Sequence, residues 1–335
     1  MGVPPISSPM QINSSTTGPF GNPLPAKLRL FAGDIKIQHT VFAMPWAILS
    51  AVLAGKTDPG SFTAGKISLI LICMITARTV AMAANRLLDA NLDAKNPRTA
   101  KRAIPAGLLS RRFFAAILVL CSCGFITACA GFQWFYKNPW PILLSVPVLI
   151  YLSGYPLMKR FTQLCHYYLG VALALAPVCA WIAITGTIAW PPVIMFVIVA
   201  AWTAGFDIIY ACQDYASDVA CGVFSIPAKF GIAKALWISR ATHILAALML
   251  IALGHLVPQF TIFYYTGAAI AIALLIIEQS LVKPSDLSKV NISFFTINGI
   301  ISIQLATLGI VDLRREGDAG SPLRHEGSEG IRIGL

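Results

Sequence analysis

Nine apolar stretches divide almost the entire chain, and each has about the length of a helix that crosses a bilayer. In lipid a segment must satisfy its own backbone hydrogen bonds, which favours helices over other structures. The connections are short and leave no room for a soluble domain. The sequence therefore predicts an all-α membrane protein with nine transmembrane helices, at about 36–55, 67–90, 113–132, 140–157, 164–186, 191–213, 235–254, 260–281 and 291–312.

The composition agrees with a membrane protein. Hydrophobic residues make up 57% of the chain and charged residues 12%, whereas soluble domains carry about 25% charged residues. The net charge of +11 does not indicate nucleic-acid binding, because the basic residues lie in short loops where membrane topology places them. We expect the lipid bilayer as a partner, but no nucleic acid and no obligate protein partner.

Lys and Arg are concentrated in alternate connections, as they are on the cytoplasmic side of multi-pass proteins. The segment before the first stretch belongs to the basic set, so the N-terminus is predicted to be cytoplasmic. Nine spans then place the C-terminal tail outside although it holds four Arg; an even number of spans is the alternative. The polar ends predict a disordered leader at 1–34 and a disordered tail at 313–335, around one membrane domain at 35–312.

The stretch NRLLDANLD, residues 85–93, ends the second apolar run with three oxygen-bearing side chains. Asn85, Asp89 and Asp93 are spaced i, i+4, i+8, which puts them on one helical face. Their oxygens suit Mg²⁺, which keeps several waters and shares substrate phosphates. Arg78 extends this face deep into the span, where a charge normally faces a partner or a cavity. A solvated helix end is the alternative interpretation.

A second polar stripe ends the sixth apolar run. Asp207, Tyr210, Asp214 and Asp218 are spaced i, i+3, i+7 and i+11, again on one helical face. The alternation of Lys and Arg puts both stripes on the cytoplasmic side. Because converging carboxylates repel one another unless cations lie between them, the two stripes predict a shared cation-binding site.

Two basic loops on the same side supply further cations. They are KNPRTAKR (95–102) and YPLMKR (155–160), and their candidate phosphate contacts are Arg98, Lys101, Lys159 and Arg160. Two carboxylate stripes, Mg²⁺ and Lys/Arg together describe a diphosphate site. Topology alone is the alternative explanation for any one of these residues. A cation-coupled transporter is the competing class, although transporters usually place their sites at mid-depth.

The acidic motifs resemble those of a known family. NRLLDANLDAKNPRT is similar to the NxxxDxxxD motif of the UbiA superfamily of membrane prenyltransferases, and DIIYACQDYASDVACG to its YxxxDxxxD motif. The resemblance runs from about residue 35 to residue 312 and is strongest to the 4-hydroxybenzoate branch. One position departs from the pattern: Arg86 stands where many members have Asp. It adds a cation near the phosphates, so we expect Arg86 to contact diphosphate.

The resemblance implies nine helices around a central cavity that faces the cytoplasm. It also implies two metal sets, one of Asn85, Asp89 and Asp93 and the other of Asp214 and Asp218. The implied reaction is Mg²⁺-dependent transfer of a polyprenyl group from polyprenyl diphosphate to a small aromatic acid.

The remaining residues receive roles from this chemistry. Asp89 and Asp214 are the expected catalytic metal ligands, and Asp207 assists loss of the phenol proton or steadies positive charge. Arg78 is expected to bind the acceptor carboxylate, with Tyr210 beside it. The expected location is a bacterial cytoplasmic membrane. The expected acceptor is 4-hydroxybenzoate in respiratory quinone synthesis, and a dihydroxynaphthoate of a futalosine-type menaquinone route is the alternative.

Overall fold

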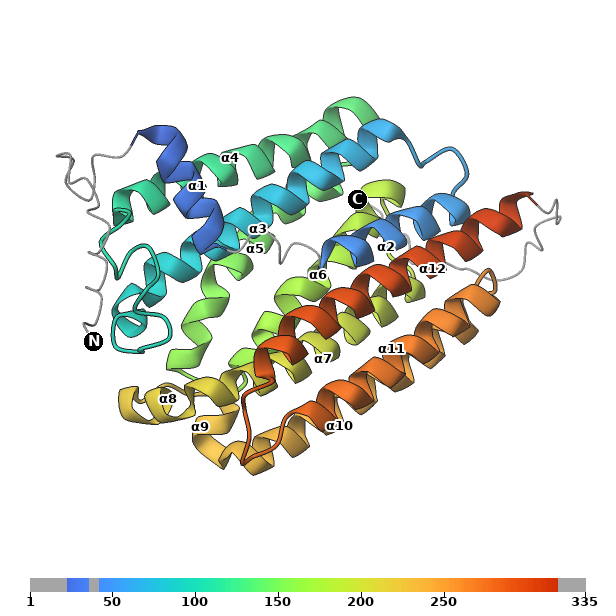
Figure 1. Cartoon of the computed structure of the whole chain (residues 1–335). Helices are drawn as coiled ribbons and strands as arrows, with labels where there is room; N and C mark the ends of the chain where they lie inside the picture. The colour runs from blue at the N-terminus through green and yellow to red at the C-terminus, as the bar shows by residue number, and fades with distance from the viewer. Residues whose placement is uncertain (1–22, 36–41, 319–335) are drawn as a thin grey trace, which may run out of the picture.

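The computed structural model describes residues 23–35 and 42–318. This part of the chain is built of helices that run side by side (Figure 1). They are α1 (Leu24–Asp34), α2 (Met44–Thr57), α3 (Ala64–Asp93), α4 (Arg111–Tyr136), α5 (Trp140–Gly154), η2 (Tyr155–Arg160), α6 (Cys165–Thr185), α7 (Trp190–Ala211), η3 (Cys212–Asp214), α8 (Tyr215–Cys221), α9 (Ile226–Phe230), α10 (Ile232–Leu256), α11 (Ile262–Leu281), η4 (Ile292–Ile297) and α12 (Asn298–Asp318).

Eight helical segments of the described chain are long and apolar enough to cross a membrane. They match the second to ninth predicted stretches, so these eight predictions are confirmed. The first predicted stretch, 36–55, is described only in part: α2 has 14 residues, and 36–41 lie outside the described residues. The eight segments are Ala64–Asp93, Arg111–Tyr136, Trp140–Arg160, Cys165–Thr185, Trp190–Cys221, Ile232–Leu256, Ile262–Leu281 and Ile292–Arg315.

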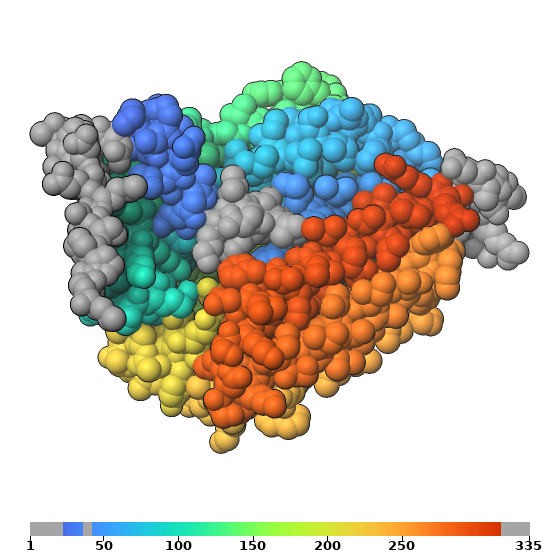
Figure 2. All heavy atoms as spheres, in the orientation of Figure 1, coloured from blue at the N-terminus to red at the C-terminus, as the bar shows by residue number. Residues whose placement is uncertain are grey.

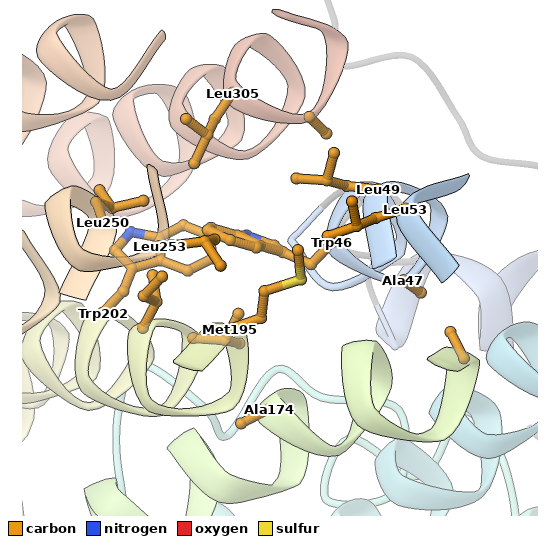
Figure 3. Close-up of a cluster of buried hydrophobic side chains, with 14 of the residues drawn as sticks. Trp46, Ala47, Leu49, Leu53, Ala174, Met195, Trp202, Leu250, Leu253 and Leu305 are labelled. Atoms are coloured by element: carbon orange, nitrogen blue, oxygen red, sulfur yellow. The ribbon is translucent and has the colours of Figure 1, made fainter. Parts of the chain in front are cut away.

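A core of large apolar side chains joins α2, α7, α10 and α12. The Trp46 and Trp202 rings are buried with centroids 6.2 Å apart, and Met195 and Leu305 lie around them (Figure 3). α6 packs on α7 and α2, and α3 packs on α4. Figure 2 shows α11 and α12 forming one long flank of the molecule. This packing fixes the long helices relative to one another and therefore fixes the polar groups at their ends.

Polar segments gather at one end of the bundle. The C-terminal end of α3, the loop to α4, and the short helices α8 and α9 all lie there (Figure 1). Ser110 caps the start of α4 by accepting a hydrogen bond from the Phe113 N–H at 3.1 Å, which defines where the loop ends. Both acidic motifs therefore reach the same end of the molecule.

The predicted disordered ends are wrong in two places. Residues 24–34 of the leader form α1, where Phe31 packs on Phe114 with ring centroids 5.1 Å apart. Short helices gain most of their stability from tertiary packing, which local composition does not reveal. At the other end α12 continues to Asp318, so the tail prediction fails over 313–318. Residues 1–22 and 319–335 lie outside the described residues.

Candidate active site

The last turns of α3 carry the first acidic motif into a cavity. Asp89 and Asp93 are 0% and 5% exposed, and Asn85 Nδ2 donates to Asp89 Oδ2 at 2.8 Å. The three residues share one face because α3 remains α-helical through Asp93. They line a cavity of about 130 Å³, called the acidic cavity below.

The second motif is divided between two cavities. Asp214 and Asp218 line the acidic cavity. Asp207 and Tyr210 instead line a cavity of about 810 Å³, the mixed cavity, which shares Asn85 with the first. The predicted face is therefore shared by two adjoining cavities. The chain tightens into the 3₁₀ turn Cys212–Asp214 before α8. A 3₁₀-helix has 3.0 residues per turn, whereas an α-helix has 3.6, so the spacing of side chains around the axis changes there.

Three carboxylates, two of them buried, each pair with a basic side chain from another segment. Asp89 Oδ2 lies 2.7 Å from Lys159 Nζ, and Asp93 Oδ1 lies 2.7 Å from Arg102 Nη1. Asp214 Oδ2 lies 2.5 Å from Arg98 Nη2. The predicted excess of negative charge is thus balanced by the basic loops, and the cavity carries both the groups that bind cations and the groups that bind phosphate.

Arg98 connects the acidic cavity to the mixed cavity. Its guanidinium donates twice to Asp214, at 2.8 and 2.5 Å, and once to the Tyr210 hydroxyl at 2.9 Å. Asn96 Nδ2 also donates to Asp214, at 2.8 Å. Burial lowers the pKa of Arg98, but the hydrogen bond and charge of Asp214 and the charge of Tyr210 outweigh it, so the pKa is raised above its usual value. Arg98 therefore stays cationic between the two cavities.

The other predicted phosphate contacts differ in position. Arg160 donates to the Leu88 carbonyl and lies 3.9 Å from Asp89, while Lys101 borders the mixed cavity. Their contact with diphosphate stays a prediction.

Arg86 has a structural role instead of the predicted phosphate contact. Its Nε lies 2.9 Å from Asp34 Oδ2, Nη2 donates to the Asp34 carbonyl at 2.8 Å, and Nη1 donates to Asn85 at 2.6 Å. The side chain is buried, and Asp34 also accepts from the Ala103 N–H at 2.7 Å. The departure from the common motif thus ties α1 to α3 and to the following loop.

Four site residues were not singled out by the sequence pattern. Arg102 and Asn96 pair with the acids as described above, and Ser225 donates to Asp218 at 2.8 Å. His166, 3% exposed at the start of α6, lies 2.7 Å from Asp207 through Nδ1. Arg102 and Asn96 lie in the same basic loop as Arg98, so the sequence of that loop is enough to suggest them as site residues. The His166 contact joins two helices 41 residues apart, and no spacing rule connects them.

Comparison with known proteins identifies the family. The model of the UbiA prenyltransferase family matches residues 43–300, more than half of the chain. The chain belongs to the UbiA prenyltransferase family. It is therefore a multi-pass integral membrane protein and a prenyltransferase, which confirms the resemblance and excludes the transporter alternative.

Relatives of this UbiA-family enzyme include proteins named as 4-hydroxybenzoate prenyltransferases. The 4-hydroxybenzoate octaprenyltransferase of Nitrosomonas europaea is 28% identical over 294 residues, covering 86% of this chain and 94% of that protein. The mitochondrial 4-hydroxybenzoate polyprenyltransferase of Arabidopsis thaliana is 29% identical over 224 residues, 64% of this chain. This chain matches about half of the Arabidopsis protein, 53% of its length.

Two solved structures share the fold. The apo UbiA homolog from Aeropyrum pernix K1 aligns with a TM-score of 0.74 and 29% identity, over 83% of this chain and 98% of that chain. A UbiA homolog from Archaeoglobus fulgidus bound to GPP and Mg²⁺ aligns with a TM-score of 0.63 over 85% and 99% of the two chains. At 17% identity the second match supports the fold alone.

The acidic cavity of this UbiA-family enzyme has donors that suit Mg²⁺. Asp89 Oδ1 is buried and accepts no hydrogen bond from the described residues. Within the same part of the chain, no three acidic, His or Cys side chains converge on one point. Mg²⁺ usually takes one or two carboxylates and completes its shell with water and substrate phosphate. The donor set therefore fits ions shared with a diphosphate, with Asn85, Asp89 and Asp93 on one wall and Asp214 and Asp218 on another.

A third cavity, of about 150 Å³, lies between α3, α4, α5 and α6. Its lining is almost entirely apolar, and Arg78 is the charged residue on it. Tyr210 lies on the mixed cavity. The structure therefore does not bring the two predicted acceptor contacts, Arg78 and Tyr210, onto one cavity.

Proposed function

We propose that this UbiA-family enzyme transfers a polyprenyl group from polyprenyl diphosphate to a 4-hydroxybenzoate-type acid in respiratory quinone biosynthesis. The observation that carries the proposal is the acidic cavity, where carboxylates from two distant motifs meet three basic side chains. The names of the Nitrosomonas and Arabidopsis relatives support the acceptor class. The Mg²⁺ and GPP of the Archaeoglobus homolog support the diphosphate class.

The proposed reaction breaks the allylic C–O bond and forms a C–C bond beside the phenol hydroxyl. Mg²⁺ bound by the two acidic motifs would supply charge neutralisation for the diphosphate. Arg98, Lys159 and Arg102 exchange their carboxylate partners for phosphate oxygens, which stabilises the leaving group. Asp207, held by His166 at 2.7 Å, steadies positive charge or accepts the phenol proton. The membrane cavity would shield the allylic cation from water.

The surrounding bundle suits a lipid substrate. The apolar cavity between α3 and α6 offers room for part of the prenyl chain, because its walls are almost entirely apolar. We propose that α2 is the first of nine spans around the cavities, with the N-terminus cytoplasmic. The concentration of Lys and Arg at the site end supports a site on the cytoplasmic side, and we propose a bacterial cytoplasmic membrane as its location.

A transfer assay tests the proposal directly. Membranes that contain the protein receive a labelled polyprenyl diphosphate with either 4-hydroxybenzoate or a dihydroxynaphthoate. We expect Mg²⁺-dependent diphosphate release and label on 4-hydroxybenzoate, and both are lost when EDTA removes the metal and return when Mg²⁺ is added. Label on the dihydroxynaphthoate alone would select the menaquinone alternative, and no label on either acceptor would contradict the proposal.

Arg78 should separate the two substrates kinetically. We expect Arg78→Ala to raise the KM for the aromatic acid about tenfold or more and to change the KM for prenyl diphosphate less, because a guanidinium binds a carboxylate bidentately. Arg78→Lys should restore only part of the loss. Equal changes in both KM values would remove Arg78 from the acceptor role and place it with the diphosphate.

A further inference from the structure

A buried polar network lies behind the mixed cavity and belongs to neither acidic motif. Glu278 in α11 is 0% exposed, and its Oε1 accepts hydrogen bonds from Ser293 at 3.1 Å and Asn298 at 2.9 Å. Its Oε2 accepts no hydrogen bond from the described residues. A carboxyl group inside a membrane span is costly and usually functional. Glu278 has no role in the proposed prenyl transfer.

The partners of Glu278 lie within and directly after an irregular helix. η4 (Ile292–Ile297) is a π-helix that leads into α12, and single π-helical turns often occur at functional sites. Asn298 Nδ2 also reaches the carbonyls of Ser293 and Phe294, at 3.1 and 3.2 Å. Asn298 Oδ1 accepts from Trp202 Nε1 of α7 at 2.6 Å. Glu278 and Trp202 thus hold the end of the π-helix from two neighbouring helices.

The π-helix presents an aromatic ring to the mixed cavity. Phe294 lines that cavity together with Asp207 and Tyr210, and its ring centroid lies 4.2 Å from that of Tyr210. One residue more or fewer in the turn would rotate Phe294 by about 100° around the helix axis. The position of Phe294 on the wall therefore depends on the π-helical turn.

We propose that Glu278 and Asn298 are positioning residues, which hold the π-helix so that Phe294 and Tyr210 form the aromatic wall against which the acceptor ring packs. This inference rests on the proposed function. Aromatic faces bind another ring by offset or edge contact, and their negative faces also favour a nearby cation such as an allylic one. The wall adjoins Asp207, so a ring packed on it lies beside the acid that the proposed reaction uses.

Four variants test the proposal in the transfer assay. Phe294→Leu removes the ring, Glu278→Leu removes the acceptor of the network, and Glu278→Gln keeps an oxygen at Oε1. Gln304→Leu is the control, because Gln304 Nε2 donates to the Gly267 carbonyl at 3.0 Å and links the same two helices away from the π-helix. KM for each substrate and the ratio of diphosphate released to prenylated product are measured.

We expect Phe294→Leu and Glu278→Leu to raise the acceptor KM about tenfold and to release more diphosphate per product. The KM for prenyl diphosphate should stay within about twofold of the parent value. Glu278→Gln should retain most activity, and Gln304→Leu should leave both KM values unchanged. The double variant Phe294→Leu/Glu278→Leu should resemble Phe294→Leu alone, because both act through one ring.

Additive effects in the double variant, or equal changes of both KM values, would overturn the inference. If Glu278→Leu does not insert in the membrane, Asn298→Ser takes its place in the same cycle. The failure of the proposed function itself is distinguishable, since the unmodified protein would then transfer no prenyl group. An active parent with an unchanged acceptor KM in Phe294→Leu would refute only the aromatic wall.

Discussion

Replacement of Asp89 by Asn will lower kcat/KM for prenyl diphosphate by at least about 100-fold. The side chain is wholly buried and sits between Asn85 and Lys159. Asn has the same shape and still accepts the hydrogen bond from Asn85, but it has lost the charge that attracts a divalent cation. Asp214→Asn should act similarly from the opposite wall. The measurement is the initial rate of labelled transfer in membranes at saturating and limiting Mg²⁺.

A matched carboxylate separates this effect from a general change in charge. Asp286 is exposed in the loop between α11 and η4 and borders none of the three cavities. Asp286→Asn should therefore transfer at the parent rate. Normal transfer by both Asp89→Asn and Asp214→Asn, at equal protein levels in the membrane, would contradict the metal assignment.

Truncation of Arg98 is expected to have the second largest effect, a loss of about 100-fold in kcat/KM for prenyl diphosphate. The guanidinium bridges Asp214 and Tyr210 with three hydrogen bonds, and its fork also matches phosphate oxygens. Arg98→Ala leaves the Asp214 carboxylate without its main counter-charge and removes one leaving-group contact. Arg98→Lys should recover part of the loss, because an ammonium supplies charge without the planar fork.

Arg112 provides the control for this experiment. It is an exposed arginine near the start of α4 and borders none of the three cavities. Arg112→Ala should retain parent activity. Steady-state KM and kcat are measured for both substrates, and an Arg98→Ala variant with unchanged KM and kcat for prenyl diphosphate would exclude Arg98 from leaving-group binding.

The Arg86 position illustrates how a motif departure is resolved only in three dimensions. From the sequence, a cation beside the first acidic motif is expected to contact phosphate. In the structure the guanidinium turns to Asp34, 52 residues earlier in the chain. Asp34 lies at the end of a helix that the polar composition of the leader concealed. A buried ion pair needs both partners and good geometry, and neither partner could be assigned from its own neighbourhood.

The second motif shows a similar limit. Its four residues fall on one face only if the helix continues with 3.6 residues per turn. The 3₁₀ turn at Cys212–Asp214 ends that period, so Asp207 and Asp214 reach different cavities. The first motif was predicted correctly because α3 remains regular through Asp93. Periodicity is thus a reliable guide within a regular helix and fails where the helix ends.

The sequence by itself determined the membrane class, eight of the spans and the face of the first acidic motif. These properties follow from bilayer thickness and helical period, which act on residues close together in the chain. Tertiary structure alone decided the pairing of each carboxylate with its base, the contact of His166 with Asp207, and the network of Glu278 behind Phe294. Those contacts join segments far apart in sequence, and they arise only when helix packing brings the segments together.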